Sequence, residues 1–203
     1  MTTDQWLAVM QAAHEAGLRS TATIMFGHVD RPVHWAHHLL RVRALQARTG
    51  GFTEFVPLPF VPMASPIYMK GRARGGPTLR EAILMHAVAR LALHPLLPNI
   101  QTSWVKMGPE GVKLCLDAGA NDLGGTLMNE SITRAAGAVH GQELGPEALE
   151  ALIRSIGRVP RQRTALYCSP AAGQVAASFG SQPLRPVIAV RRERSRAGSV
   201  FKS

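Results

Sequence analysis

Three histidines on one face of a predicted helix have a spacing that could support metal chemistry. His34, His37 and His38 lie at positions i, i+3 and i+4, and zinc hydrolases use such spacings. The sequence has no H-E-x-x-H motif and no clear carboxylate ligand beside them. Arg41 lies on the same stripe, where its charge would repel a cation. We therefore expect a solvated helix face and no metal site.

Polar residues also interrupt or follow four short apolar segments, and these are candidates for binding a ligand. Glu54 lies within an apolar segment, where an unpaired buried carboxylate would be costly. A structural ion pair and a ligand contact explain it equally well. Asp122 precedes a pair of glycines, which allows close approach of a backbone or a ligand. His28 follows a glycine at the end of a segment, where it either orients a substrate or caps a loop.

The elements that must position these side chains alternate between strands and helices. Apolar and β-branched runs predict four strands, at residues 20–26, 52–57, 100–105 and 121–127. Helical patterns lie before, between and after them, at 5–16, 30–48, 78–93, 108–119 and 146–156. Thr78 with Glu81 has capping-box spacing, and Gly17 and Gly157 follow predicted helix ends.

This alternation predicts an α/β fold with a parallel sheet. The sequence contains neither G-x-G-x-x-G nor G-x-x-x-x-G-K-[ST], so a Rossmann or P-loop nucleotide site has no support. We favour part of a β/α barrel, because a complete one needs about 250 residues and four strand–helix units fill half of it. In such barrels the chemistry lies at the carboxyl ends of the strands. We expect Asp122 to face that mouth, and Asp122→Asn to reduce turnover more than stability.

The charge of the chain is unevenly distributed. The 203 residues carry a net charge of +10 and are 46% hydrophobic. Residues 168–203 contribute half of this charge and are rich in Ser, Ala, Gly, Pro and Arg, which predicts a flexible basic tail after a barrel part at 1–167. A nucleic-acid partner is the weakest explanation. No apolar run could span a membrane and no signal-peptide pattern is present, so we expect a cytoplasmic location.

The segment 61–77 is long for a connection without structure of its own, which favours a lid or binding loop. It carries Lys70, Arg72 and Arg74. An anionic ligand and ordinary solvation both explain these three basic residues.

Several segments together resemble a known family. TATIMFGHVDRPVHWAHHLL resembles the fifth strand and following helix of radical S-adenosylmethionine enzymes. Four further segments resemble, in the same order, the tyrosine-using half of the deazaflavin-precursor (FO) synthases. They are GGFTEFVPLPF, NIQTSWVKMGPEG, AGANDLGGTLMNESITRAAGAVHGQEL and PRQRTALY. The resemblance covers nearly all of residues 1–167, and it implies the carboxyl-terminal half of a radical S-adenosylmethionine barrel.

The resemblance also implies a reaction and its cofactors. Members of the family use a 4Fe-4S cluster and S-adenosylmethionine to join a tyrosine-derived p-hydroxybenzyl group to 5-amino-6-(D-ribitylamino)uracil. The family's C-x-x-x-C-x-x-C cluster loop is missing here, and Cys115 and Cys168 cannot replace three closely spaced thiolates. We therefore expect this chain alone to hold neither cofactor, and its partners to be the other half of the barrel and, in fused enzymes, a second synthase half.

The resemblance places two groups of residues. Those matching the strand end beside the adenosyl group are Met25, Phe26, Gly27 and His28. Those matching positions that point toward L-tyrosine and the aminouracil are Glu54, Gln101, Ser103, Asn121, Asp122 and Thr126. Two alternatives stay open: a sibling radical enzyme of menaquinone (futalosine) biosynthesis, and an inert fragment that serves as an interaction module.

Overall fold

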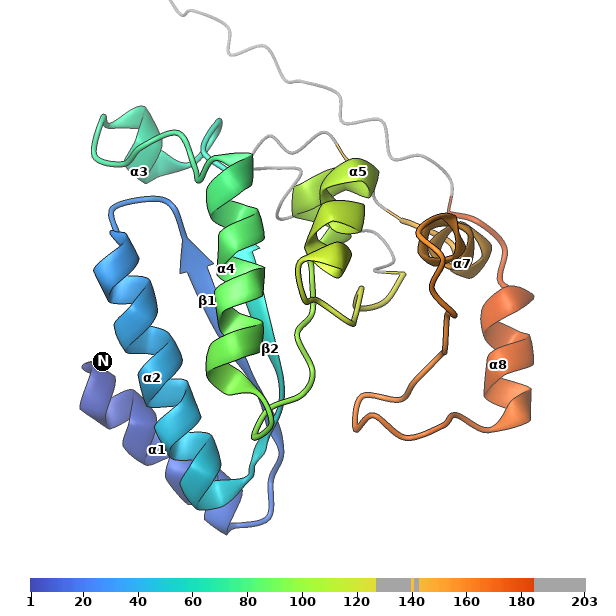
Figure 1. Cartoon of the computed structure of the whole chain (residues 1–203), viewed down its shortest axis with the longest axis horizontal. Helices are drawn as coiled ribbons and strands as arrows, with labels where there is room; N and C mark the ends of the chain where they lie inside the picture. The colour runs from blue at the N-terminus through green and yellow to red at the C-terminus, as the bar shows by residue number, and fades with distance from the viewer. Residues whose placement is uncertain (127–139, 141–142, 185–203) are drawn as a thin grey trace, which may run out of the picture.

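The computed structural model describes residues 1–126, 140 and 143–184. Helices and strands alternate through the first half of the chain, and helices alone follow (Figure 1). The strands are β1 (Ser20–Phe26) and β2 (Phe52–Pro59). The helices are α1 (Thr3–Glu15), α2 (Pro32–Thr49), α3 (Pro66–Met69), α4 (Leu79–Leu93), α5 (Trp104–Asp117), α7 (Pro146–Ser155) and α8 (Ala172–Phe179).

The sheet is parallel, as predicted, but only two of the four expected strands form. β1 pairs with β2 in parallel register, with Ala22 opposite Phe55. The other two predicted strands each contribute one isolated parallel bridge, Phe55 to Ile100 and Gln101 to Asp122. The prediction of four full strands is thus wrong for the described residues, although the order and direction of the four segments agree with it. Residue 127, the end of the fourth predicted strand, lies outside the described residues.

The helix boundaries follow local signals in the sequence. Thr78 and Glu81 form the predicted capping box at the start of α4, and Thr2 forms another at the start of α1. Gly50 ends α2 in the left-handed conformation, which costs glycine little. The predicted helix at 146–156 is confirmed as α7.

Helix α5 begins earlier than predicted. Residues 104 and 105 belong by pattern to a strand, but they form the first turn of α5. Their side chains are buried in a core cluster with Val112 and Leu116 from later turns of the same helix, so tertiary packing overrides the β-propensity of Trp and Val. The predicted start at Gly108 and Pro109 is instead a kink, where Gly108 has a φ of 65°.

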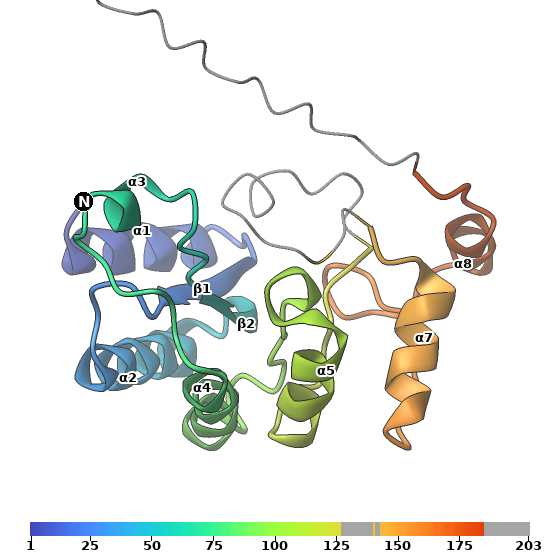
Figure 2. The same cartoon turned by 90° about the horizontal axis from the view of Figure 1, so that it is seen from above.

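The helices pack in sequence order. α1 contacts α2, α2 contacts α4, α4 contacts α5, and α5 contacts α7. Seen from above, α2, α4, α5 and α7 follow one another in a row that starts beside the sheet and continues past it (Figure 2). Trp35, Leu39 and Val42 of α2 are buried and join one core cluster with Phe26 and Phe55 of the strands.

Two predicted loops contain short helices. The segment 61–77 includes α3, and its Arg74 forms an ion pair with Glu81 at 2.9 Å, which explains one of its three basic residues without an anionic ligand. Helix α8 lies inside the predicted tail at 168–203 and contacts α7. The start of the tail is therefore helical, and its flexibility remains a prediction. Residues 185–203 lie outside the described residues.

The three-histidine face is less uniform than predicted. His34 and His37 are exposed, but His38 is partly buried with its Nε2 enclosed and without a hydrogen-bond partner among the described residues. The His38 ring therefore lies toward the sheet, with its centre 6.0 Å from the centre of the Phe55 ring. The absence of zinc there remains a prediction. No described helix is long and apolar enough to cross a membrane.

Acid should destabilise the fold through its buried histidines. His86 is fully buried, and its Nε2 has no partner in the described part of the chain. Burial lowers the pKa of His86 below its usual 6.5, and it also lowers the pKa values of His14 and His38. Below about pH 6.5 the unfolded chain takes up protons that the folded chain resists. Each such group should therefore remove up to about 1.4 kcal/mol of stability per pH unit.

The measurement is urea unfolding at several pH values between 7 and 5. His86→Leu should weaken the fall in stability without abolishing it, because His14 and His38 remain. An unchanged pH dependence in this variant would show that His86 does not contribute.

Candidate functional site

One face of the sheet carries exposed side chains, and the candidate site lies there. Thr21, Thr23 and Met25 of β1 are exposed, whereas Ala22 and Phe26 are buried among the helices. Because side chains alternate along a strand, the exposed residues share one face, which we call the inner face. The register pairs Thr21 with Glu54, so Glu54 of β2 belongs to the inner face as well.

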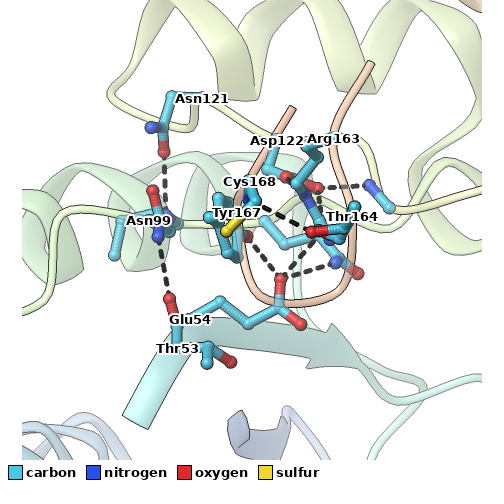
Figure 3. A network of polar contacts seen from close by, with 12 residues as sticks. Thr53, Glu54, Asn99, Asn121, Asp122, Arg163, Thr164, Tyr167 and Cys168 are labelled. Atoms are coloured by element: carbon cyan, nitrogen blue, oxygen red, sulfur yellow. Dashed lines mark hydrogen bonds and ion pairs between the residues drawn. The ribbon is translucent and has the colours of Figure 1, made fainter. Parts of the chain in front are cut away.

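Glu54 is the centre of a polar network, although only 8% of its surface is exposed. Its Oε2 accepts hydrogen bonds from Gln101 Nε2 at 3.0 Å and from the phenol of Tyr167 at 2.6 Å. Arg163 Nη2 lies 3.2 Å from the same oxygen and completes an ion pair. Figure 3 shows Arg163 and Tyr167 directed at the same carboxylate oxygen of Glu54.

Arg163 joins a second buried carboxylate to this network. Its Nε and Nη2 both donate to Asp122, the latter to Oδ1 at 2.9 Å (Figure 3). Asp122 Oδ1 also accepts from the backbone N–H of Gly124 at 2.6 Å. This paired contact uses the planar fork of the guanidinium, which suits a carboxylate better than a lysine ammonium does.

The loop that carries Arg163 and Tyr167 is closed on itself. Thr164 N donates to the carbonyl of Cys168, and Cys168 N donates to Thr164 Oγ1 at 3.1 Å. Tyr167 has a φ of 62°, which is rare for a residue with a side chain. The Arg163 guanidinium lies 4.1 Å from the centre of the Tyr167 ring, a cation–π geometry. The two side chains therefore enter the inner face as one unit.

The protonation of the network is fixed by its own contacts. Burial lowers the pKa of Arg163, but the hydrogen bond and charge of Asp122 outweigh this and raise it above its usual value. Burial raises the pKa of Tyr167, and the hydrogen bond to Glu54 raises it further. Arg163 is therefore a permanent cation and Tyr167 a neutral phenol at any ordinary pH.

The structure brings together half of the predicted substrate residues. Glu54, Gln101 and Asp122 share the network, whereas Asn121 does not: its Oδ1 accepts from Ile100 N and Arg90 Nη2, both at 2.8 Å. Ser103 is the residue before α5, and the carbonyl of Thr126 accepts a bond from Leu144. Glu54 is the third residue of β2 and thus lies within the strand, as the sequence indicated.

Of the predicted cofactor residues, Met25 and Phe26 end β1, and Gly27 and His28 begin a hydrogen-bonded loop after it. Both oxygens of Asp30 accept from the N–H of Gly27, and Oδ1 also accepts from the N–H of His28 at 2.8 Å. The Trp35 indole N–H donates to Oδ2 of Asp30. Burial would raise the pKa of Asp30, but these hydrogen bonds, that of Trp35 first, lower it to about 2. A permanent carboxylate thus holds the backbone of this loop.

Side chains at this strand end point in different directions. Met25 is 54% exposed on the inner face, whereas Phe26 is fully buried and packs edge-on against Trp35. Only the backbone of Phe26 could therefore meet a ligand. Gly27 has a φ of 90°, and a Cβ there would lie 2.4 Å from Pro77, so this position requires glycine.

A pocket lies beyond the carboxyl end of β2. It has a volume of about 280 Å³ and is bordered by Phe60, the glycines at 75 and 76, and Lys106 and Met107 of α5. None of the ten predicted site residues lines it. A second pocket of about 240 Å³ is lined by Met25 together with residues of α1 and α2.

Comparison with known proteins identifies the family. A family model described as the CofH/MqnC C-terminal region matches residues 49–173, more than half of the chain. The chain belongs to this family. The matched residues include Glu54, Gln101, Asp122, Arg163 and Tyr167, so the complete network lies within the CofH/MqnC C-terminal region.

Curated relatives of this CofH/MqnC C-terminal region are larger proteins. The chain is 53% identical over 167 residues to the FO synthase of Mycobacterium leprae, covering 82% of this chain and 19% of that protein. It is 52% identical over 164 residues to the 5-amino-6-(D-ribitylamino)uracil–L-tyrosine 4-hydroxyphenyl transferase of Methanopyrus kandleri, covering 81% and 44%. The FO synthase of Streptomyces coelicolor is 53% identical over 162 residues. The chain spans less than half the length of these relatives.

The thiols of this CofH/MqnC region do not fit an iron–sulfur cluster. Cys115 is fully buried, and burial raises the pKa of its thiol to about 11, whereas Cys168 is exposed. No group of three His, Cys, Asp or Glu side chains in the described residues could hold a metal ion. A thiol that stays protonated is a poor ligand, because the thiolate is the form that binds metal.

Arg163 and Tyr167 were not singled out from the sequence. The segment PRQRTALY carried the family resemblance, but nothing in its spacing assigned a role to either residue. The available signal was indirect. Glu54 and Asp122 were predicted to point inward, and two buried carboxylates require a cation, which must be an arginine or lysine from elsewhere in the chain.

Proposed function

We propose that this chain is the carboxyl-terminal, substrate-holding part of an FO synthase. The complete enzyme joins a tyrosine-derived p-hydroxybenzyl group to 5-amino-6-(D-ribitylamino)uracil in the cytoplasm. The observation that supports this most is the 52% identity over 81% of the chain to a protein named as the corresponding 4-hydroxyphenyl transferase. In this proposal residues 1–167 form part of the barrel and residues 168–203 a basic tail.

The inner face supplies the polar groups for the substrates. Glu54, Gln101 and Asp122 are the proposed contacts for L-tyrosine and the aminouracil, with Ser103 and Thr126 nearer the carboxyl ends of their segments. Asn121 is not part of this network, because its amide oxygen accepts hydrogen bonds from Ile100 N and Arg90. Hydrogen bonds of this kind orient two reactants, which is the protein's main contribution when a cofactor supplies the reactive species.

In this proposal the rest of the enzyme holds the cofactors. Radical chemistry would come from a 4Fe-4S cluster and S-adenosylmethionine, and the described residues hold no cluster ligands. The resemblance assigns Met25 to His28 to the neighbourhood of the adenosyl group. The other half of the barrel, and in fused enzymes a second synthase half, are the proposed partners.

Anaerobic reconstitution tests this division of labour. The chain alone, supplied with iron, sulfide and reductant, should form no 5′-deoxyadenosine from S-adenosylmethionine, because two distant thiols cannot leave one iron of a cluster open for the cofactor. Addition of a cluster-bearing fragment of a relative should restore cleavage that depends on tyrosine. Robust cleavage by the isolated 203 residues would contradict the proposal.

One second candidate has a specific observation in its favour. The matching family model is shared with MqnC, which suits a sibling enzyme of menaquinone biosynthesis. Identification of the product separates the two, since the first candidate yields a deazaflavin precursor and the second a futalosine-type compound. Failure to bind either set of substrates with the cluster-bearing fragment present would leave the interaction module as the remaining alternative.

A further inference from the structure

Residues 163–168 form a compact loop, here called the strap, that lies against the inner face of the sheet. Its anchors are the two side chains that enter the network, Arg163 and Tyr167, while Ala165 and Leu166 between them are exposed. Glu54 lies more than 100 positions earlier in the sequence. The strap thus connects the end of the matched region to its first strand.

The strap ties together segments that the backbone holds only weakly. Ile100 and Gln101 share one bridge each with their neighbours, so no continuous ladder joins β2 to Asp122. Arg163 contacts both Glu54 and Asp122, and Gln101 contacts Glu54. Side-chain bonds therefore fix three neighbouring segments where ladder bonds are few.

The strap also fixes the orientation of the Glu54 carboxylate. Three donors converge on Oε2, from Gln101, Arg163 and Tyr167. Oε1 accepts no hydrogen bond from the described residues and points away from the strap (Figure 3). A carboxylate oxygen has two lone pairs, so with respect to the described residues Oε1 keeps both for a donor.

The charges of the network do not balance. Glu54 and Asp122 carry two negative charges and Arg163 one positive charge, so among the described residues of the network one negative charge remains on largely buried side chains. Buried charge favours an additional N–H donor, and a cationic one most of all. Both compounds named for the relatives' reaction contain such groups, an ammonium in L-tyrosine and an amine in the aminouracil.

We propose that Arg163 is a positioning residue, which with Tyr167 holds Glu54 so that Oε1 receives an N–H group of a substrate. This assignment rests on the proposed function for the identity of the substrate. The orientation of Glu54 by the strap is a property of the chain itself, so the two parts can be tested separately.

Titration of Tyr167 tests the strap without any reaction. The chain has two tyrosines, so Tyr68→Phe leaves Tyr167 as the only phenol. In this background the tyrosinate absorbance should appear well above the usual pKa of about 10, with folding monitored by circular dichroism. Glu54→Gln should move the transition toward the usual value, and Arg161→Gln should not, because Arg161 contacts Ser169 outside the network. Ordinary titration of Tyr167 in the folded protein would overturn the strap.

Binding and turnover test the substrate contact in the enzyme completed with a cluster-bearing part. Arg163→Gln should raise KM and the equilibrium Kd of one substrate by roughly ten- to a hundredfold, with a smaller change in kcat. Arg163→Lys should recover part of this loss, and Arg161→Gln should match the parent. If KM and Kd of the Arg163→Gln variant equal those of the parent enzyme, the proposed substrate contact is rejected. Binding and turnover are measured separately because they test different proposals. An enzyme that binds these substrates without converting them would count against the proposed function, whereas the change in Kd would still test the contact between Glu54 and the substrate.

Discussion

Replacement of Arg163 by methionine is expected to lower the free energy of unfolding by about 3 kcal/mol, because it leaves two buried carboxylates without their cation. Glu54 and Asp122 are only 8% and 9% exposed. The methionine retains most of the apolar stem, so the loss reports mainly on charge and hydrogen bonding. Urea unfolding at neutral pH gives the value.

Arg161→Met is the matched control, since it removes the same kind of side chain from an exposed position two residues away. It should change stability by less than about 0.5 kcal/mol. Combining Glu54→Gln with Arg163→Met should cost less than the sum of the single changes, because the first removes one of the charges that the second leaves unpaired. A strictly additive result would contradict a direct ion pair.

A comparably large effect is expected from Leu93→Ala, about 2–5 kcal/mol. Leu93 is completely buried in the core cluster that joins the strands to α2 and α4. Leu91 lies two residues earlier in the same helix but is 81% exposed. Leu91→Ala should therefore change stability little, and it serves as the control that removes the effect of helix propensity from the comparison.

Both variants are measured by urea unfolding under the same conditions. Equal losses for the two substitutions would mean that α4 does not pack in the orientation described. A loss confined to Leu93 would confirm that the core lies on the sheet side of this helix.

Local signals made much of the fold predictable. The capping box at Thr78, Gly17 after α1 and the β-branched run of β1 act within a few residues, and each predicted its element to within a few positions. The prediction of a strand at Trp104 and Val105 was wrong, because burial in a second core cluster decides their conformation. The single bridges at Gln101 and Asp122 could not be predicted, since pairing depends on distant neighbours.

The residues of the candidate site were also predictable only in part. Glu54 and Asp122 could be found because a carboxylate in an apolar context requires an explanation. Their partners could not be found in this way. Arg163 lies 109 positions after Glu54, and no pattern in the residues around it indicates burial. Phe26 shows the converse: the resemblance places it beside a cofactor, but strand alternation turns its side chain into the core.

The strap sets an order on the formation of the site during synthesis. Glu54 pairs with Arg163 across 109 positions and with Tyr167 across 113. Closing loops of this length is slow compared with forming a helix. Until Arg163 has been synthesised, Glu54 and Asp122 lack the cation that pairs with them in the folded chain. The site therefore cannot be complete before Arg163 and Tyr167, at the end of the family signature, have folded back onto β2.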